Sequence, residues 1–524
     1  MRTVGLDFGT HQTKICVGES IDKRNFTYEF LSFKDLDGNE SYMLPSVVQI
    51  NDDETLSYGF VDESRAKLDS IFVPEECPQF EMEEPIKPEL PTEPIPYTEE
   101  DIYQKFPNFD RCNEKAQKDI KSCYDIINKM MMNNYHFIKN KLQQNYNNQQ
   151  FVYTQKKSKF DSSFEKWNKR YGHPHKSIFR YFKQASLSKY EWPYIVESDY
   201  LCVFYLTNIL FLLKSKYGNE FQLQVGIPTG YKEAEEKKNK AYTLVINAFK
   251  LAEDYFNNDY DAFLQAKYSD LMSAVSMNPY TRDDAEDYEL KVFPEAYANL
   301  FPIASNNRFE KKISLIFDIG GGTTDISLFI IKEKIDENGY KSIYPEIFSF
   351  YSVPQGLNFI MENSLKDNDE KYRKLTIDSP CIDPHKLEDT IKAYELNVLK
   401  FVNQSLEYMA KQYKYKGYNH KEFYKQLEPN IRLYSGGGYS DILNFYFPYF
   451  TDSHIIGFDY FQNDEYIQDL EKVKNYGQIL STAFGLAHDQ KTDQIKLASI
   501  IEFFDHLADN NYQNDKDYGL ADNG

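Results

Sequence analysis

The chain has 524 residues, with 60 basic and 81 acidic side chains, a formal net charge of −21 and a pI near 5.0. This balance argues against nucleic acid or an anionic membrane as the main partner, because both need positive potential on the protein. The six cysteines form no close pairs and have no histidines at metal-binding spacing. We therefore expect reduced thiols and a cytoplasmic location.

The first predicted element is a β-hairpin whose strands cover residues 3–7 and 14–17. Its turn follows Asp7 and contains Gly9, and a glycine lets backbone N–H groups approach an anion without obstruction by a Cβ atom. A phosphate would repel Asp7, so the role of this carboxylate beside a phosphate is to hold Mg²⁺ or its waters. The residues predicted to bind the phosphate are Gly9, Thr10, His11 and Thr13.

A large insertion is predicted at residues 72–175. Between Pro74 and Pro96 seven prolines alternate with glutamates, a composition that favours extended, polyproline-like structure. Apolar residues then recur at three- and four-residue intervals from Ile120 to Leu142, and an aromatic series repeats this spacing at 160–171. We expect a helical hairpin whose two stripes pack on each other and on the first domain. An exposed groove for a partner is the alternative.

Two further segments precede the second glycine-rich turn. The apolar run 201–213 is interrupted by Thr207 and Asn208 and is too short to span a bilayer, so it predicts a buried helix. The segment 254–289 predicts an extra helix followed by an acidic loop.

The most informative stretch is 317–325, which places two carboxylates and three glycines between apolar runs at 313–317 and 326–331. The pattern predicts a second phosphate turn between two buried strands. Asp318 and Asp325 would serve a metal ion or its waters rather than the phosphate itself. The residues predicted to bind the phosphate are Gly320, Gly321, Gly322 and Thr323.

A third glycine cluster follows the short apolar segment 431–434. It consists of Gly436, Gly437, Gly438 and Tyr439, and its backbone could pack flat against a base and a ribose. Any one of the three motifs alone is more often an ordinary turn. All three in this order, each after an apolar strand, predict a site for a metal-bound nucleotide.

These motifs together resemble the actin, heat-shock chaperone and sugar-kinase superfamily of ATPases, and most of all the nucleotide-binding domain of the seventy-kilodalton heat-shock chaperones. The resemblance covers nearly the whole chain. Residues 7–10 resemble the first phosphate loop of the family, 317–325 the second, 433–439 the adenosine loop, and 480–487 the closing helix. The resemblance implies an α/β, two-lobed actin-like ATPase fold of duplicated ribonuclease-H-like domains. Lobe I would be 1–304, lobe II 305–475 and the closing helix 476–490.

Two catalytic residues are implied by the resemblance. Glu295 follows Pro294 as in plasmid-segregation actins, although Phe293 stands where many of the chaperones have their glutamate. Glu295, together with Asp325, would orient the attacking water; the alternative is a helix first-turn carboxylate favoured by the helix dipole. Lys183 matches a phosphate-contacting lysine of the chaperones, and the alternative is a solvated surface lysine.

The implied ligands are ATP, ADP and Mg²⁺, with Asp7 and Asp318 holding the metal, and the implied activity is slow hydrolysis of ATP to ADP and phosphate. Only 37 residues follow Ala487, so we expect at 491–524 a C-terminal helix and an acidic tail, and no peptide-binding domain. The expected function is a switch that couples nucleotide state to lobe closure and to an unknown protein partner, met through the insertion. The alternatives are a filament-forming actin-like ATPase and, less favoured, a metabolite kinase.

Overall fold

The computed structural model describes the chain over most of its length and divides it into two compact units. The first, here called the body, comprises Met1–Ile71 and Pro174–Gly524, and the second, the arm, comprises Phe72–His173. The described residues are 2–20, 26–188, 190–228, 234–275, 277–300, 314–335, 341–366, 381–414, 432–436, 455–457 and 466–488. The predicted lobe II, 305–475, lies within the body, whereas the predicted lobe I, 1–304, is divided, because most of its insertion 72–175 forms the arm. The predicted segment 491–524 lies outside the described residues.

The body contains a first mixed sheet in the strand order β13-β12-β1-β2-β3. Strands β1 and β2 form the predicted hairpin, β2 is antiparallel to β3, and β12 runs parallel to both β1 and β13. The short strand β6 also pairs with β2. The strands are β1 (Arg2–Phe8), β2 (Gln12–Ser20), β3 (Phe26–Phe30), β6 (Leu44–Pro45), β12 (Gln222–Ile227) and β13 (Leu290–Pro294).

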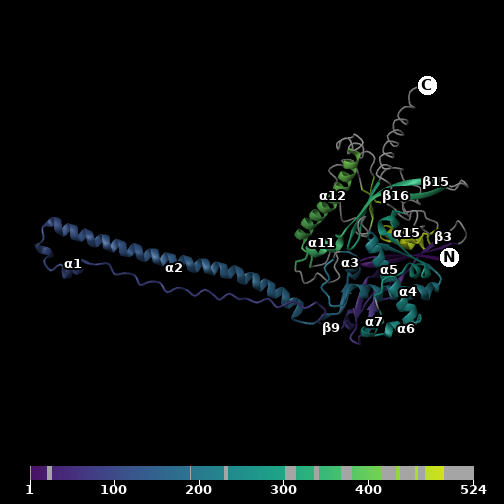
Figure 1. Ribbon diagram of the computed structural model, residues 1–524, viewed down its shortest axis with the longest axis horizontal. Coiled ribbons are helices and arrows are strands. Elements are labelled where there is room, and N and C mark those ends of the chain that lie inside the picture. The colour runs from purple at the N-terminus through teal and green to yellow at the C-terminus, as the bar shows by residue number, and fades with distance from the viewer. Residues whose placement is uncertain are drawn as a thin grey trace, which may run out of the picture. The chain divides into compact units, whose positions relative to one another are not determined.

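A second sheet has the order β16-β15-β14-β17-β18 and repeats the topology of the first. Strands β14 and β15 form the second predicted hairpin, β15 is antiparallel to β16, and β17 runs parallel to both β14 and β18. Strands β15 and β16 extend as a long two-stranded ribbon (Figure 1). The strands are β14 (Ser314–Ile319), β15 (Thr324–Ile335), β16 (Lys341–Val353), β17 (Arg432–Gly436) and β18 (Ile455–Gly457).

Helix α4 (Ser198–Tyr217) confirms the buried helix predicted over 201–213. Its residues from Leu201 to Phe211 are all buried, which is the pattern of a helix enclosed on every side. No helix in the described part of the chain is long and apolar enough to cross a bilayer. Helix α4 packs against α3 (Phe182–Leu187), α5 (Ala234–Lys250) and the π-helical turn η3 (Leu251–Tyr255).

The segment 254–289 differs from the prediction of one helix and an acidic loop. It forms three short helices. The first two end at residues with extended backbone, Ala266 and Val275, and the first and third begin with a side-chain cap from Asp259 or Thr281. The helices are α6 (Tyr260–Gln265), α7 (Tyr268–Ala274) and α8 (Arg282–Asp287). The capping residues were visible in the sequence, and they mark the separate starts that periodicity alone does not show.

Short strands complete the body, and two of them, β9 and β10, adjoin the arm in sequence. Strand β7 pairs with β8 and β11, β9 pairs with β10, and β4 pairs with β5. The elements are β4 (Phe33–Lys34), β5 (Glu40–Ser41), β7 (Val47–Ile50), β8 (Leu56–Tyr58), η1 (Glu63–Arg65), β9 (Leu68–Asp69), β10 (His175–Lys176) and β11 (Ile178–Arg180).

Helix α15 (Gly477–Leu486), the predicted closing helix, packs against β1 and β2 at very short range. A Cβ atom on Gly5 would lie 2.2 Å from the Ala483 carbonyl oxygen, and one on Gly18 would lie 2.4 Å from that of Ala487. On another side, a Cβ on Gly485 would lie 1.8 Å from the carbonyl oxygen of Ala298 in α9 (Glu295–Ala298). Glycine is therefore required at all three contacts, because any side chain would push the helix away.

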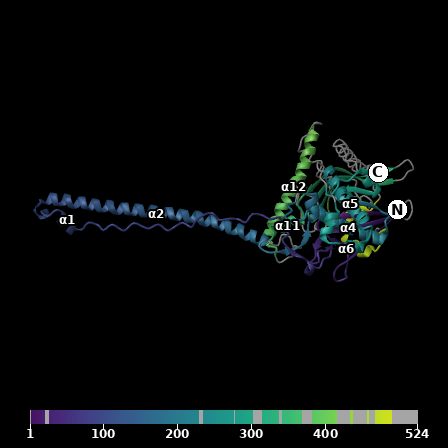
Figure 2. The same cartoon turned by 60° about the horizontal axis from the view of Figure 1, so that its bottom comes forward.

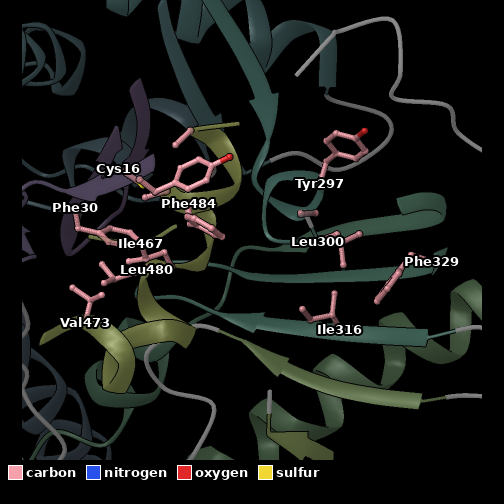
Figure 3. Packing of buried hydrophobic residues seen from close by; sticks show 14 of the residues in the cluster. Cys16, Phe30, Tyr297, Leu300, Ile316, Phe329, Ile467, Val473, Leu480 and Phe484 are labelled. Carbon is pink, nitrogen blue, oxygen red and sulfur yellow. The ribbon is translucent and has the colours of Figure 1, made fainter. Parts of the chain in front are cut away.

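The core around α15 joins the two sheets. One buried cluster includes Cys16 and Phe30 from the first sheet, Ile316 and Phe329 from the second, and Phe484 from α15 (Figure 3). The other described helices of this region are α11 (Leu357–Asn363), α12 (Pro384–Lys414), α14 (Leu470–Val473) and the 3₁₀ turn η6 (Lys474–Tyr476). Because the hairpins β1–β2 and β14–β15 both contribute to this cluster, shared packing connects them.

The arm is built on one uninterrupted helix, so the predicted helical hairpin is wrong. Helix α2 (Glu114–Tyr171) runs for 58 residues from an Asn113 cap to Gly172. The two stripes predicted for separate helices lie on this one helix. Some of their residues, among them Tyr124, Phe160 and Trp167, contact an extended segment, residues 73–98, here called the strap, whereas Cys123 and Met130 are exposed. The strap lies beside α2 in both views (Figures 1 and 2). Helix α1 (Glu99–Lys105) and the turn η2 (Phe109–Arg111) connect the two.

The strap covers one face of α2 with a period of three residues. Met82, Tyr97 and the prolines between them at 85, 88, 91 and 94 are partly buried, while the residues between these positions are exposed. Three residues per turn is the period of a polyproline helix. Phe80 packs on Tyr153 and Phe160, and Tyr97 packs on Tyr124. The 17 residue-to-residue steps from Phe80 to Tyr97 span about 53 Å at about 3.1 Å each, which fits the roughly 44 to 54 Å of α2 between these contacts.

Candidate functional site

The first hairpin brings an acid and a base together at its open end. Asp7 is the second-last residue of β1 and lies directly opposite Lys14 on β2. The Lys14 Nζ is 2.9 Å from Asp7 Oδ2, with only 15% and 9% of the two side chains exposed. In the turn the Gly9 N–H donates to the Asp7 carbonyl at 3.0 Å, and a Cβ on Gly9 would lie 2.2 Å from the Gln12 carbonyl oxygen. The turn therefore needs glycine at this position.

The hydroxyl groups of the first turn point in different directions. Thr13 is fully buried and its Oγ1 lies 3.3 Å from Ser46 Oγ, which itself donates to the Gly9 carbonyl at 2.7 Å. Thr13 thus supports the shape of the turn, and the structure does not bring its hydroxyl to the other predicted site residues. Thr10 Oγ1, in contrast, lies against the second turn: it would be 2.7 Å from a Cβ on Gly322.

The second hairpin has the same register but a different pair at its end. Asp318 on β14 lies directly opposite Asp325 on β15. The Thr323 hydroxyl donates to Asp325 Oδ2 at 3.4 Å, whereas the buried Oδ1 of Asp325 accepts no hydrogen bond from the described residues. The turn is closed by the Gly320 N–H, which donates to the Thr323 carbonyl at 2.9 Å. An unpaired buried carboxylate oxygen is costly unless a ligand or a cation completes it.

The two turns touch through three side chains, here called the loop interlock: His11, Gln184 and Asn358. The His11 ring lies against Gly321, where a Cβ would come within 2.7 Å, and its Nε2 hydrogen-bonds Asn358 Oδ1. The amide of Gln184 donates to the Gly322 carbonyl at 3.0 Å, and that of Asn358 donates to Gln184 Oε1 at 3.2 Å. Burial lowers the pKa of His11 to about 4, so the ring is neutral at physiological pH.

Helix α11 holds the second turn from behind. The N–H of Leu357 donates to the Gly320 carbonyl at 3.1 Å, and that of Asn358 donates to the Gly321 carbonyl at 2.8 Å. The Gly320 and Gly321 carbonyls are therefore both bound by α11. The same helix supplies the interlock residue Asn358, so α11 connects the shape of the second turn with the first.

The predicted catalytic residues Lys183 and Glu295 form a buried ion pair. Their Nζ and Oε1 atoms are 2.6 Å apart, and Lys183 is only 3% exposed, so its interpretation as a solvated surface lysine is wrong. Glu295 is the first residue of α9, as the helix-dipole alternative requires, but it is also buried. Burial raises the pKa of Glu295, while the nearby Lys183 opposes this shift and Asp7 adds to it.

Four carboxylates thus gather at the ends of the two hairpins. Burial first, then the charges of Asp7 and Glu295, raise the pKa of Asp318 to about 7. Burial, together with Glu295 and Asp318, also raises the pKa of Asp325. The buried cations that act on this group, Lys14 and Lys183, are each committed to one carboxylate. The excess of buried negative groups favours protons or a cation at this place.

The four carboxylates can bind a metal ion in one of two ways, by enclosing it or by holding a hydrated ion through one or two oxygens. Among the described residues no set of three or more His, Cys, Asp or Glu side chains is arranged to enclose a metal ion. Mg²⁺ in nucleotide sites usually keeps several waters and uses only one or two carboxylates. Asp318, with its raised pKa, and Asp7 at the matching strand end fit that second mode.

Asn299 and Ser481 support Asp318, and sequence reasoning missed both. Asn299 Nδ2 donates to Asp318 Oδ2 at 3.0 Å, and Ser481 Oγ in α15 donates to Asn299 Oδ1 at 2.6 Å. Lys14 and the interlock residues Gln184 and Asn358 were also missed. For Lys14 a signal existed, because this lysine directly precedes the apolar run 15–17 of the predicted strand. The others depend on contacts between distant segments and have no local signal.

The third glycine cluster is only partly described. Gly436 ends β17 and lies in register beside Asp318. This places the beginning of the cluster at the edge where the second turn begins. Gly437, Gly438 and Tyr439 lie outside the described residues.

The sequence was also compared with known proteins. No protein-family model and no curated protein matches the chain.

Proposed function

We propose that the protein is a Mg-ATP-binding, slowly hydrolysing molecular switch with the two-lobed actin-like fold. The observation that carries the proposal is the repeat: two sheets of identical topology each end their first strand in an Asp-x-Gly turn, and the two turns meet. Duplicated halves with facing phosphate turns are the arrangement that the resemblance to the heat-shock chaperone ATPases implies. ATP would bind between them.

The residues divide the work of binding. Backbone N–H groups of the turns at Gly9–Thr10 and Gly320–Thr323 would hold the β- and γ-phosphates from opposite sides. Asp7 and Asp318 would hold hydrated Mg²⁺, which supplies neutralisation of phosphate charge when bound. Lys14 forms an ion pair with Asp7 at 2.9 Å and so holds this carboxylate in place at the end of the hairpin. The Gly436 cluster would face the adenosine.

Hydrolysis needs a group that orients water near the γ-phosphate. Asp325 has a buried oxygen without a hydrogen bond, whereas Glu295 is committed to Lys183. We therefore assign the orientation of the attacking water to Asp325. Glu295 and Lys183 are buried neighbours whose charges act on the Asp325 carboxylate. Burial, with the charges of Glu295 and Asp318, raises the pKa of Asp325 and so makes its carboxylate a stronger proton acceptor.

The switch follows from the loop interlock. His11 and Gln184 fill the contact between the turns, so phosphate entry must separate the His11 ring from Gly321 and the Gln184 amide from Gly322. The first turn joins two strands of the first sheet, and the second turn joins two strands of the second sheet. Bound phosphate would therefore set the angle between the halves, and its loss would let the turns close again.

The test is Mg-dependent nucleotide binding and turnover by the whole chain. We expect Asp318→Ala to abolish the effect of Mg²⁺ on ATP affinity, and Asp325→Ala to keep binding while turnover falls about 100-fold or more, the range for loss of a general base. Leu36→Ala, an exposed residue of the body, is the control. Unchanged Mg-ATP affinity in Asp318→Ala would contradict the site assignment.

A further inference from the structure

Helix α2 has a second face that nothing in the described chain covers. On the side opposite the strap, Ile126, Met130, Phe137 and Phe151 are exposed by 54%, 66%, 65% and 65%. At about 100° per residue these four side chains fall within about 60° of one another. Exposed apolar side chains gathered in this way mark an interaction surface.

The exposed stripe follows a heptad spacing. The four apolar residues and four amide residues form one series in which successive members are alternately four and three positions apart. Every member of the series is exposed. The series, here called the seam, is Ile126, Met130, Asn133, Phe137, Asn140, Gln144, Asn147 and Phe151. It spans about 38 Å of helix. Alternating three- and four-residue spacing is the pattern by which one helix packs along another.

We propose that α2 pairs with α2 of a second copy of this chain, in parallel and in register, through the seam. In this arrangement every apolar seam residue meets its own copy, and every amide meets its own copy. Paired amides hydrogen-bond across a seam and fix the register, at a cost in stability. An antiparallel pair centred on the seam would instead place Met130 opposite Asn147 and Phe137 opposite Asn140, which buries amides against apolar groups.

The charge of the arm favours a second copy as the occupant. Helix α2 carries 12 basic and 5 acidic residues, so two bare copies would repel each other. The strap brings seven glutamates and one lysine to the opposite face of the same helix and offsets this excess. The seam itself contains no charged residue, and its flanks between 126 and 151 carry no carboxylate. An acidic partner would find few cations on this face, whereas a second neutral seam matches it.

The pairing is independent of nucleotide. The seam residues belong to the arm, and the proposed ATP site belongs to the body, so either can fail without the other.

The first experiment is sedimentation equilibrium of the full chain under reducing conditions. We expect a mass near twice 61.7 kDa that returns to the monomer value in the double variant Met130→Asn/Phe137→Asn. The matched control is Leu36→Asn, equally exposed at 65% but located in the body, which should stay dimeric. Circular dichroism checks that α2 remains helical in both variants. A wild-type chain that stays monomeric over a wide concentration range overturns the proposal.

A second experiment fixes direction and register with a native residue. Cys123 is exposed and continues the seam three residues before Ile126. In the parallel pair it meets its own copy, so mild oxidation should give a covalent dimer that Cys123→Ser abolishes. Cys77→Ser, which removes another exposed cysteine of the arm, should leave it intact. A wild-type chain that is dimeric in solution but gives no Cys123–Cys123 cross-link on oxidation contradicts the parallel register.

Discussion

The two hairpins that form the candidate site share their topology and register but differ in charge. In the first, the aspartate at the strand end faces Lys14; in the second, the aspartate at the matching position faces Asp325. The first hairpin is therefore neutralised within itself. The second keeps two carboxylates with raised pKa values and one oxygen without a hydrogen bond. A repeated backbone thus provides the same turn twice, while single residues decide which copy demands a cation or a proton.

The largest effect should come from breaking the neutral hairpin with Lys14→Met. The change leaves Asp7 buried beside Glu295 and Asp318 without its cation, and removal of one partner of a buried ion pair costs about 3–5 kcal/mol. Scanning calorimetry of the unliganded protein should show a large fall in melting temperature. The double variant Asp7→Asn/Lys14→Met should recover most of the loss. Equal stability of Lys14→Met and the wild type would show that the pair is not buried as described.

The second hairpin should respond in the opposite direction to loss of charge. Asp318 has a pKa raised to about 7, above its unfolded value, so its contribution to stability is complete below about pH 4 and is lost as pH rises through 7. Asp318→Asn removes this loss and should stabilise the unliganded protein near neutrality by up to about 4 kcal/mol. Urea unfolding between pH 4 and 8 measures the difference. If the difference in the free energy of unfolding between variant and wild type becomes smaller as the pH rises, the raised pKa of Asp318 is contradicted.

The contact between the hairpins should be weakened by His11→Ala. The variant loses the hydrogen bond to Asn358 and the packing on Gly321, which is worth about 1–2 kcal/mol. Because the interlock closes the turns together, nucleotide should also bind and leave faster. Stopped-flow exchange of a fluorescent nucleotide tests the rate, with His488→Ala as a control at a buried histidine away from the turns. Unchanged exchange rates would separate the interlock from the switch.

The smallest effect should come from Ser481→Ala, which acts on the second hairpin alone. The hydroxyl orients Asn299, and Asn299 in turn binds Asp318. We expect a loss of about 1 kcal/mol in the free energy of unfolding, with ATP affinity reduced only when Mg²⁺ is present. Isothermal titration with and without Mg²⁺ checks this. An equal loss of affinity in both conditions would indicate a general packing defect.

The sequence predicted the features that depend on local pattern. Both hairpins, the strand ends at Asp7 and Asp318 and the closing helix follow from apolar runs, glycines and their spacing. The pairing of Lys183 with Glu295 joins residues 112 positions apart, and so it required the fold. The same holds for the loop interlock. No periodicity in one segment reports which distant side chain it will meet.

The arm shows a different limit. Periodic stripes at 120–142 and 160–171 fit one long helix as well as two short ones, because the period is the same. The decisive signal was the absence of any glycine or proline from 114 to 171, which leaves nothing to end the helix before Gly172. The strap was predicted as extended, but its place on α2 was not. The packing of the strap on α2 can be inferred only when the three-residue period of the strap is compared with the helix.

The most direct test of the account is the affinity for ATP as a function of Mg²⁺, measured on the wild type, Asp7→Asn and Asp318→Asn by isothermal titration. If the two hairpins form one metal-nucleotide site, Mg²⁺ should raise the affinity of the wild type at least tenfold, and each single variant should remove this gain. ATP binding that ignores Mg²⁺, or a gain that survives in either variant, would contradict the shared site.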